Sequence, residues 1–328
     1  MLMRRLGRTG YQVSEIGFGA WGIGGGMWQG GNDEHSAHAL RQAITLGINF
    51  IDTALAYGEG HSERLIASVL DRHPERHRTI IATKIPPMDS VWPARATTPF
   101  EKVFPARHIV DCVETSLANL KVDALPLEQF HVWNDAWLSD PAWHESRGAM
   151  VRLVEQGKVL HWGVSVSDHA PETAMGLLAD PLIDTAQAIY NIFDRSPERG
   201  LFDMAREKPL GVIVRVPFDE GALTGAIGPE TVFPAGDWRE RYFRGERKAD
   251  AARRAAALEA LLGEEARSLP ELALRFCLSR PEVSTVISGM RSARHAEENA
   301  SVSDGRVLSA GLLEQLGWHA WEKNWYAQ

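Results

Sequence analysis

The sequence predicts a (β/α)8 barrel with an N-terminal β-hairpin and long βα loops, formed by one domain that spans residues 1–328. Three observations lead to this prediction: eight short apolar runs rich in Val and Ile, amphipathic segments that separate most of them, and no low-complexity linker between two halves. Strands that alternate with helices form a parallel sheet covered by helices. Eight repeats of this unit suit a closed barrel better than an open sheet.

The predicted strands are short and apolar, which is typical of buried parallel strands. They are Val13–Ala20, Ile48–Asp52, Thr79–Lys84, Leu127–Val132, Leu160–Val166, Thr185–Tyr190, Val212–Val216 and Val283–Ser288. The predicted helices have an apolar face that repeats about every 3.6 residues. They are Glu34–Leu46, Ser62–Arg72, Arg107–Leu120, Glu145–Gln156, Glu172–Leu178, Glu198–Glu207, Pro270–Leu278 and Ala293–Ala300, with a further solvated helix at Ala249–Leu262.

Other segments extend the barrel. Met1–Gln12 is predicted to form a hairpin that turns at Gly7–Gly10 and closes the barrel floor. The connections Ile85–Pro105 and Pro217–Gly245 are long and rich in Pro and Gly, and long βα loops are usually functional. The tail, Leu308–Gln328, carries a helix-like segment and three tryptophans.

Composition excludes several classes of function. The net charge of -8 argues against nucleic acid as a partner, because phosphate binding needs a basic face. No apolar stretch approaches the length of a membrane span, and Met1–Arg8 lacks the apolar run of a signal peptide, so we expect a cytoplasmic protein. The two cysteines, Cys112 and Cys277, are expected to be buried thiols, and no metal site is predicted.

Polar residues end most of the predicted strands. Asp52, Lys84, His131, Ser165, Gln187 and Arg215 each follow or end an apolar run, and Tyr57 lies in the short loop after Asp52. The carboxyl ends of all strands meet at one face of a (β/α)8 barrel, where active sites are built. So many polar strand ends therefore predict an active site at this face.

Four of these residues make chemical sense together. Tyrosine is a poor acid near neutrality, and a nearby ammonium lowers its pKa. Lys84 can supply that charge, Asp52 can hold Lys84 in place, and His131 can bond to the substrate oxygen. The set predicts that Tyr57 is a general acid for a carbonyl oxygen. The alternative is a structural Asp52–Lys84 ion pair beside a buried tyrosine and histidine, and the coincidence of all four at strand ends favours catalysis.

The segment Gly17-Phe18-Gly19-Ala20-Trp21-Gly22 matches the dinucleotide fingerprint G-x-G-x-x-G. In that motif the last glycine opens a helix, whereas here further glycines follow and the next helix is predicted near Asp33. A flexible loop at the barrel mouth is the favoured interpretation, and a Rossmann fold is the second choice of architecture.

The chain resembles the aldo-keto reductase family over residues 4 to 326. Gly47-Ile48-Asn49-Phe50-Ile51-Asp52-Thr53-Ala54, followed by Ala56-Tyr57-Gly58 and Ser62-Glu63, is similar to the family's signature around its catalytic Asp and Tyr. Ile81-Ala82-Thr83-Lys84 and Glu128-Gln129-Phe130-His131 resemble its lysine and histidine strands. The resemblance implies an enzyme that transfers hydride between a nicotinamide cofactor and a small carbonyl or alcohol substrate. NADP(H) is the cofactor that it implies first, and NAD(H) is the second choice. The catalytic residues would be Tyr57, Asp52, Lys84 and His131.

The resemblance also implies the cofactor contacts. They are Trp21, Asp52, Ser165, Gln187, Arg215, Pro217, Asp219, Gly221, Leu223, Gly289, Arg291, Arg294, His295, Glu298 and Asn299. Within this set, Ser165 and Gln187 would hold the nicotinamide carboxamide, residues 219–223 would line the pyrophosphate, and Arg291 would meet the adenosine phosphate at a helix N-terminus. Glu298 and Asn299 would meet the adenine.

Three positions depart from the family pattern. Val166 follows Ser165 where many members have Asn, Arg215 stands where many members stack an aromatic ring on the nicotinamide, and His295 replaces a common Arg. A planar guanidinium can stack on a ring, so Arg215 is predicted to pack against the nicotinamide, with a salt bridge to Asp219 or Glu220 as the alternative.

Two questions stay open. The same fold also serves as a regulatory barrel that binds a partner, as in potassium-channel β subunits, and intact catalytic residues do not exclude that role. The substrate is not named by the sequence. An aromatic mouth suits sugars and aromatic aldehydes equally well, and each tryptophan in it has packing under a loop as its alternative. The tryptophans considered for this mouth are Trp21, Trp28, Trp92, Trp133 and Trp137.

Overall fold

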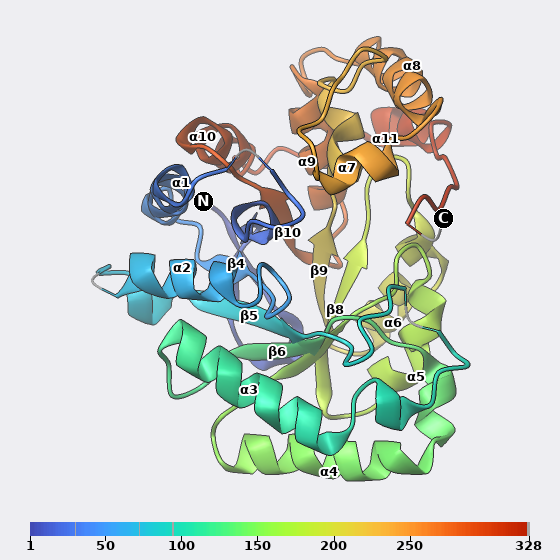
Figure 1. The fold of residues 1–328 in the computed structure, drawn as a ribbon. Coiled ribbons are helices and arrows are strands. Elements are labelled where there is room, and N and C mark those ends of the chain that lie inside the picture. The colour runs from blue at the N-terminus through green and yellow to red at the C-terminus, as the bar shows by residue number, and fades with distance from the viewer. Residues whose placement is uncertain (30, 72, 94, 327–328) are drawn as a thin grey trace.

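The computed structural model describes residues 1–29, 31–71, 73–93 and 95–326. In these residues eight parallel strands close into a barrel, which confirms the predicted fold class (Figure 1). The strands, in chain order, are β3 (Ile16–Gly19), β4 (Phe50–Asp52), β5 (Ile80–Ile85), β6 (Leu127–Phe130), β7 (Trp162–Ser165), β8 (Ile183–Ile189), β9 (Gly211–Arg215) and β10 (Val283–Gly289). Each pairs with its chain neighbour, and β10 pairs with β3 to close the ring.

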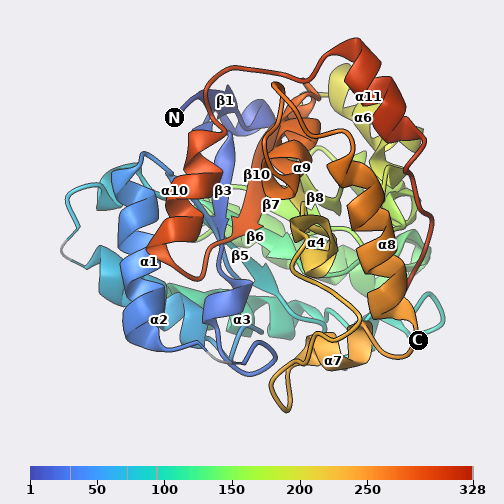
Figure 2. The ribbon, with the colours of Figure 1, turned by 90° about the horizontal axis from the view of Figure 1, so that it is seen from above.

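Helices surround this barrel, as the view from above shows (Figure 2). They are α1 (Asp33–Thr45), α2 (His61–Leu70), α3 (Ala106–Leu120), α4 (Pro141–Glu155), α5 (Met175–Leu178), α6 (Leu201–Glu207), α7 (Trp238–Tyr242), α8 (Arg247–Glu259), α9 (Leu269–Leu278), α10 (Ala293–Ser301) and α11 (Ala310–Gly317). The first and last helices of the ring, α1 and α10, pack side by side, as their strands do. In the described part of the chain, no helix is both long and apolar enough to cross a lipid bilayer.

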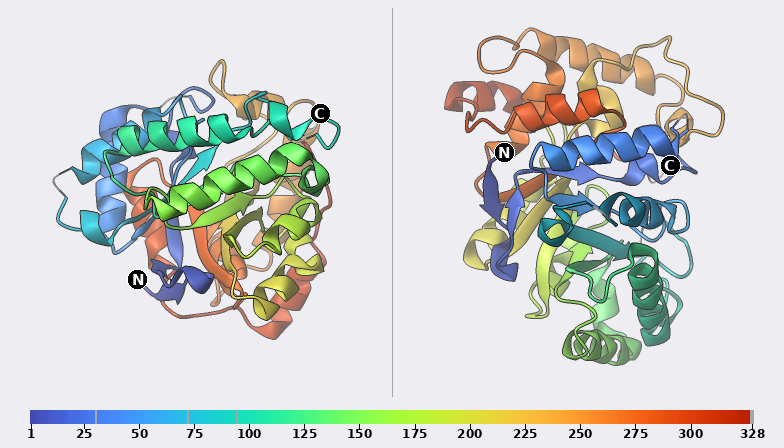
Figure 3. Two further views of the ribbon diagram at one scale, coloured as in Figure 1. Left: turned by 90° about the horizontal axis from the view of Figure 1, so that it is seen from below. Right: turned by 90° about the vertical axis from the view of Figure 1, so that its left-hand side faces the viewer.

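The N-terminal hairpin is present, but its bounds differ from the prediction. Its strands are β1 (Met3–Arg5) and β2 (Gln12–Ser14), and the hairpin lies beside the N label in Figure 3. Its Leu6 and Val13 pack on residues near the amino ends of the barrel strands. The predicted strand Val13–Ala20 is therefore two strands, since its first residues belong to the hairpin. The chain turns at Glu15, whose buried carboxylate accepts from Arg4 Nε at 2.8 Å. Both halves of the run are apolar because the floor and the barrel are each buried.

Other differences have local causes. The predicted helix Glu198–Glu207 is a 3-10 turn followed by α6, divided at Gly200 (φ 135°). The predicted helix Glu172–Leu178 is likewise a 3-10 turn followed by the single turn α5. The long connection after β9 contains the short helix α7. Arg72, the last residue predicted for the second helix, and the last two residues of the tail lie outside the described residues.

The glycine-rich motif does not form a dinucleotide-binding turn. Gly17 and Gly19 lie within β3, Gly22 lies in a short 3-10 turn, and α1 begins only at Asp33. The Rossmann alternative is therefore wrong, because the closed barrel has no switch point between two half-sheets.

The glycines serve instead to bring two loops into direct contact. A Cβ at Gly58 would lie 1.9 Å from the carbonyl oxygen of Gly24, and the φ of Gly58 is +63°. A Cβ at Gly24 would lie 2.9 Å from the Cβ of Tyr57. The loop after β3 thus packs backbone to backbone on the loop that carries Tyr57, and it fixes the position of that side chain.

We predict that Gly58→Ala lowers the free energy of unfolding by at least about 3 kcal/mol, because overpacking adds to the strain of a left-handed residue. Gly157→Ala is the matched control, since Gly157 has a φ of +71° and nothing within 4 Å of an added Cβ. It should cost only about 1 kcal/mol. Urea denaturation of both variants measures the difference. Equal losses would show that the contact between the two loops contributes nothing.

Candidate active site

The strand ends converge as predicted, and three of the polar residues form a buried network. Lys84 Nζ lies 2.7 Å from Asp52 Oδ2, and Gln187 Nε2 donates to Asp52 Oδ1 at 2.7 Å. The side chains of Lys84 and Asp52 are 0% and 3% exposed. Asp52 on β4 therefore connects β5 on one side with β8 across the barrel.

The lysine is held by three acceptors. Besides Asp52, its Nζ donates to the carbonyl oxygen of Thr53 at 2.7 Å and makes a long contact of 3.5 Å with the phenol oxygen of Tyr57. An ammonium has three N–H donors, so this geometry uses all of them. Burial lowers the pKa of Lys84, and the charge of Asp52 opposes this shift. The arrangement presents a fixed positive charge to the tyrosine.

The tyrosine behaves differently from the prediction in one respect. Burial raises the pKa of Tyr57 well above its ordinary value, the charge of Asp52 raises it further, and Arg215 lowers it. The expected net lowering of this pKa is wrong, because burial dominates and because Asp52 already balances the charge of Lys84. The phenol is therefore held in its protonated form, which is the form that a general acid needs.

His131 lies next to the phenol. Its ring centre is 5.6 Å from that of Tyr57 and 4.6 Å from that of Trp92, and both pairs are T-shaped. Burial lowers the pKa of His131 well below its ordinary value, with help from the charges of Lys84 and Arg215. Its Nδ1 is buried and has no partner among the described residues. A neutral imidazole can donate or accept one hydrogen bond at a substrate oxygen.

Arg215 ends β9 and faces this group. Its Nη2 donates at 3.1 Å to the carbonyl oxygen of Val166, the residue that departs from the family pattern. In the part of the chain that the structure describes, neither Asp219 nor Glu220 forms an ion pair with it, and its Nε is buried without a partner. The salt bridge considered as the alternative for Arg215 is thus not formed among these residues. The guanidinium keeps one buried N–H that can donate to a further acceptor.

The loop after β9 carries two buried carboxylates. Asp219 accepts from Lys323 Nζ at 2.7 and 2.9 Å, one contact at each oxygen. Glu220 accepts from the hydroxyl of Tyr326, and burial raises the pKa of Glu220 to about 7. Lys323 and Tyr326 were not predicted. The signal available in the sequence was only the aromatic-rich tail around the lysine.

A second missed residue lies near Arg291. The Nη2 of Arg291 donates to the carbonyl oxygen of Gln29 at 2.7 Å, in the glycine-rich loop. The guanidinium of Arg239 lies 4.2 Å from the ring centre of Trp28, and that of Arg291 lies 5.9 Å from it. Burial lowers the pKa of Arg291, the charge of Arg239 lowers it further, and the charge of Asp237 opposes this shift. Both guanidinium groups thus lie near one tryptophan, and Arg239 is also paired with Asp237, the N-cap of α7, at 2.8 Å. The sequence carried no signal that singled out Arg239.

The other predicted residues lie on β7, in the loop after β9, at the end of β10 and on α10. Ser165 is buried and pairs in register with Gln187, and Pro217, Gly221 and Leu223 lie in the loop after β9. Gly289 ends β10, and the remaining four lie on α10. On that helix, exposed Arg294 pairs with Glu298 at 3.2 Å, and buried Asn299 donates to Ser288 Oγ at 3.1 Å. His295 is partly buried on the first turn, where its backbone N–H is capped by Ser292.

The aromatic mouth is smaller than expected. Trp21, Trp28 and Trp238 contact one another, and Trp92 is 45% exposed. In contrast, Trp133 and Trp137 are buried among Phe100, Phe104 and Trp143, so their role is packing. Of the two alternatives left open for Trp133 and Trp137, packing is the one the structure shows, because the loop after β6 folds them inward.

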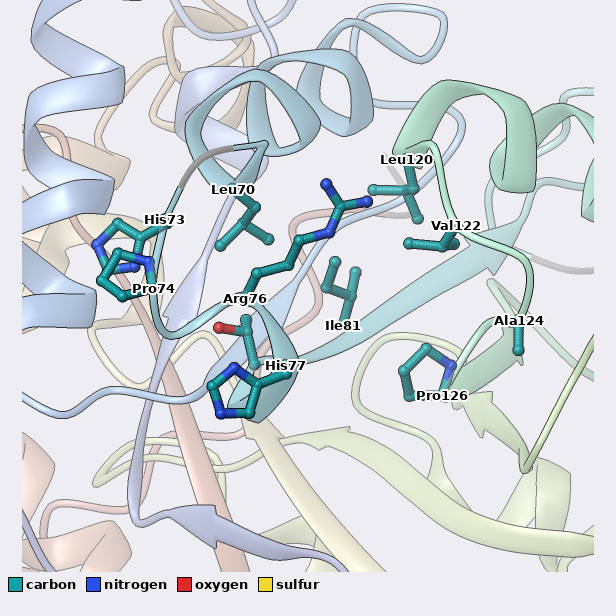
Figure 4. Close-up of a pocket in the computed structure, with 11 residues that line it drawn as sticks. Leu70, His73, Pro74, Arg76, His77, Ile81, Leu120, Val122, Ala124 and Pro126 are labelled. Carbon is teal, nitrogen blue, oxygen red and sulfur yellow. The ribbon is translucent and has the colours of Figure 1, made fainter.

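A pocket of about 420 Å³ opens elsewhere, at the opposite ends of β5 and β6 (Figure 4). His73, Arg76 and His77 line one side of it, and Val122 and Pro126 line the other. None of the polar strand ends contributes to this pocket. We therefore assign the candidate site from the buried network at the carboxyl ends of the strands.

Comparison with known proteins agrees with this site. The model of the aldo/keto reductase family matches residues 15–316. The chain is 30% identical to the aldo-keto reductase YhdN of Bacillus subtilis over 90% of this chain and 86% of that protein. It is 28% identical to the NADH-specific methylglyoxal reductase of Escherichia coli over 90% and 91% of the two chains.

A solved structure also superposes on the barrel. The glycerol dehydrogenase AKR11B4 of Gluconobacter oxydans has a TM-score of 0.78 at 27% identity, with 97% of this chain and 94% of that chain covered. Fold, sequence and family model thus agree over nearly the whole length. This protein is a member of the aldo/keto reductase family.

Proposed function

We propose that the protein is an NADP(H)-dependent oxidoreductase that interconverts a small carbonyl compound and its alcohol, with Tyr57 as the general acid and base. The observation that carries this proposal is the buried Asp52–Lys84 ion pair whose ammonium faces the phenol of Tyr57. The presence of all four predicted catalytic residues favours a reductase over a barrel that serves only as a regulatory partner. The names of two similar proteins, a methylglyoxal reductase and a glycerol dehydrogenase, support a small substrate.

The protein's own groups would manage the proton. In reduction, Tyr57 donates its proton to the carbonyl oxygen, and the ammonium of Lys84 stabilises the phenolate that this leaves. His131, kept neutral, orients the same oxygen through a hydrogen bond. In oxidation, the phenolate accepts the proton from the alcohol. The nicotinamide, when bound, supplies or accepts the hydride.

The structure offers groups suited to this cofactor. We expect Ser165 and Gln187, which pair in register on neighbouring strands, to hold the carboxamide. The planar guanidinium of Arg215 can stack on the nicotinamide face. Arg291 and Arg239 lie around Trp28, and Arg239 is paired with the buried carboxylate of Asp237 at 2.8 Å. Arg291, which forms no ion pair among the described residues, is therefore the cation that suits the 2'-phosphate. This cation is our reason for proposing NADP(H) over NAD(H), although one similar protein is NADH-specific.

We predict that Tyr57→Phe reduces turnover by about 10²-fold or more, the scale of a positioned acid, while NADPH binding stays nearly unchanged. NADPH oxidation with a panel of small aldehydes, ketones and sugars measures the first quantity, and fluorescence titration measures the second. Tyr11→Phe is a suitable control, because Tyr11 packs against His161 away from the network. Near-normal turnover in the Tyr57 variant would remove the proposed acid.

We predict that Lys84→Met slows both directions and oxidation most, because oxidation requires the phenolate that the ammonium stabilises. Loss of the positive charge raises the pKa of Tyr57 further. Reduction needs the protonated phenol, so the basic limb of its pH profile should move to higher pH. The pH dependence of kcat/KM in both directions checks this. Unchanged rates and an unmoved limb would make the ion pair purely structural.

We predict that the wild-type protein binds NADPH more tightly than NADH, and that Arg291→Ala weakens NADPH binding by about 10- to 100-fold, the strength of one charge-assisted hydrogen bond. NADH binding should change less than about threefold. Arg294→Ala, which removes an exposed guanidinium paired with Glu298, should have the smaller effect of the two. Calorimetric dissociation constants provide the test. Equal wild-type affinities would contradict the proposed preference.

A further inference from the structure

The C-terminal segment Trp321–Tyr326, here called the C-terminal strap, lies along the loop that follows β9. The backbone N–H of Trp321 donates to the carbonyl oxygen of Phe193 at 2.8 Å, which ties the strap to the loop after β8. At its other end the ring of Tyr326 stacks on Trp238 with an interplanar angle of 11°. The strap therefore spans two of the loops at the barrel mouth.

The loop beneath the strap is strained. Val216, Asp219 and Glu220 have φ values of 55°, 47° and 58°, a region that non-glycine residues rarely adopt. Such conformations persist only where surrounding contacts determine them, and they gather at ligand sites. Two of these three residues are also carboxylates that are nearly excluded from water.

The strap supplies a partner to each carboxylate. Lys323 contacts both oxygens of Asp219, and the two side chains are only 5% and 1% exposed. Tyr326 donates its hydroxyl to Glu220. The lysine is itself held by two aromatic rings, since its Nζ lies 4.9 Å from the ring centres of both Trp321 and Trp325. Both contacts to the loop are thus built from buried, oriented groups.

Charge explains why these contacts matter. A loop that receives a diphosphate should not present a free carboxylate to it, because two negative charges repel strongly in a site with little water. Asp219 lies in the segment proposed to line the pyrophosphate. Lys323, on the C-terminal strap, neutralises the charge of Asp219. Glu220 carries only part of a negative charge near neutrality, and Tyr326 holds its carboxyl in place.

We propose that the C-terminal strap is a working part of the cofactor site, in which Lys323 neutralises Asp219 and Tyr326 fixes Glu220, so that the loop after β9 accepts the anionic pyrophosphate of a dinucleotide. Lys323 and Tyr326 are positioning residues that act through the loop. This proposal rests on the proposed use of a nicotinamide dinucleotide.

Four variants of the full chain test the electrostatic role of Lys323. Lys323→Met should weaken NADPH binding by at least about tenfold while kcat at saturating NADPH stays within about twofold. Asp219→Asn should bind NADPH at least as tightly as the wild type, because the lysine is then an unbalanced cation. The double variant should regain most of the binding lost in Lys323→Met. Lys323→Arg should retain wild-type binding.

Glu322→Gln is the matched control within the strap, since Glu322 is 82% exposed and pairs only with Arg199 among the described residues. It should leave the dissociation constant unchanged. Melting temperatures of all variants identify any that fail to fold, and the double variant keeps the test valid if the single one is unstable.

Equal weakening in Lys323→Met and Asp219→Asn would overturn the proposal, because it would show a mechanical clamp in place of charge neutralisation. No change in either variant would also overturn it. A wild-type protein that binds neither NADPH nor NADH would overturn the proposed function together with the strap. Binding and Tyr57-dependent turnover that do not respond to Lys323→Met would overturn the strap alone.

Discussion

Lys84 and Asp52 carry opposite charges at a depth where water reaches almost none of either side chain. Burying an ion pair costs desolvation free energy that the attraction between the charges repays only when further hydrogen bonds complete the site. Here Gln187 and the carbonyl oxygen of Thr53 provide those bonds. Hydrophobic residues of similar volume would give comparable stability, so the pair is best understood through what it does to Tyr57.

The positions of the catalytic groups and of the cofactor-binding groups at the barrel mouth follow from this constraint. Asp52, Lys84 and His131 lie on strands or directly after them, where neighbouring backbone fixes their positions. Tyr57 lies in the loop after β4, which packs on the glycine-rich loop. The groups assigned to the cofactor phosphates lie on loops, and each is held by a contact from a different loop or from the strap. Arg291 bonds to the glycine-rich loop, and Asp219 bonds to the C-terminal strap. Rigid strands suit chemistry that needs fixed geometry, and connected loops suit a ligand that must enter and leave.

Much of this arrangement could be predicted from the chain alone. Apolar runs that end in Asp52, Lys84 and His131 predicted both the strands and the active site. The apolar run of a buried strand and the polar residue at its end are both local signals in the sequence. The hairpin was misplaced because Val13 and Ile16 are equally apolar, and no local signal separates the floor from the barrel. The pKa of Tyr57 could not be predicted either, because it depends on burial by segments far away in sequence.

The same limit explains the missed residues. Lys323 contacts Asp219, which lies roughly a hundred positions away in the sequence. Arg239 contacts Trp28, which lies roughly two hundred positions away. A single sequence shows neither pairing, since no residue near any of the four in the chain points to its distant partner. The sequence left two alternatives open for Trp133 and Trp137, because a tryptophan after a strand end looks the same whether its loop turns toward the mouth or into the core.

The seam between β3 and β10 has a consequence for how the barrel folds. Val286 pairs with Ile16, so the ring closes between residues about 270 positions apart along the chain. Contacts between distant residues form late, because loop-closure entropy is lost before the contacts stabilise the chain. The other neighbouring strands join segments much closer in sequence. We therefore expect a refolding intermediate in which β3 to β10 each pair with their chain neighbour and the seam between β3 and β10 is open, with closure of the ring as the slow step.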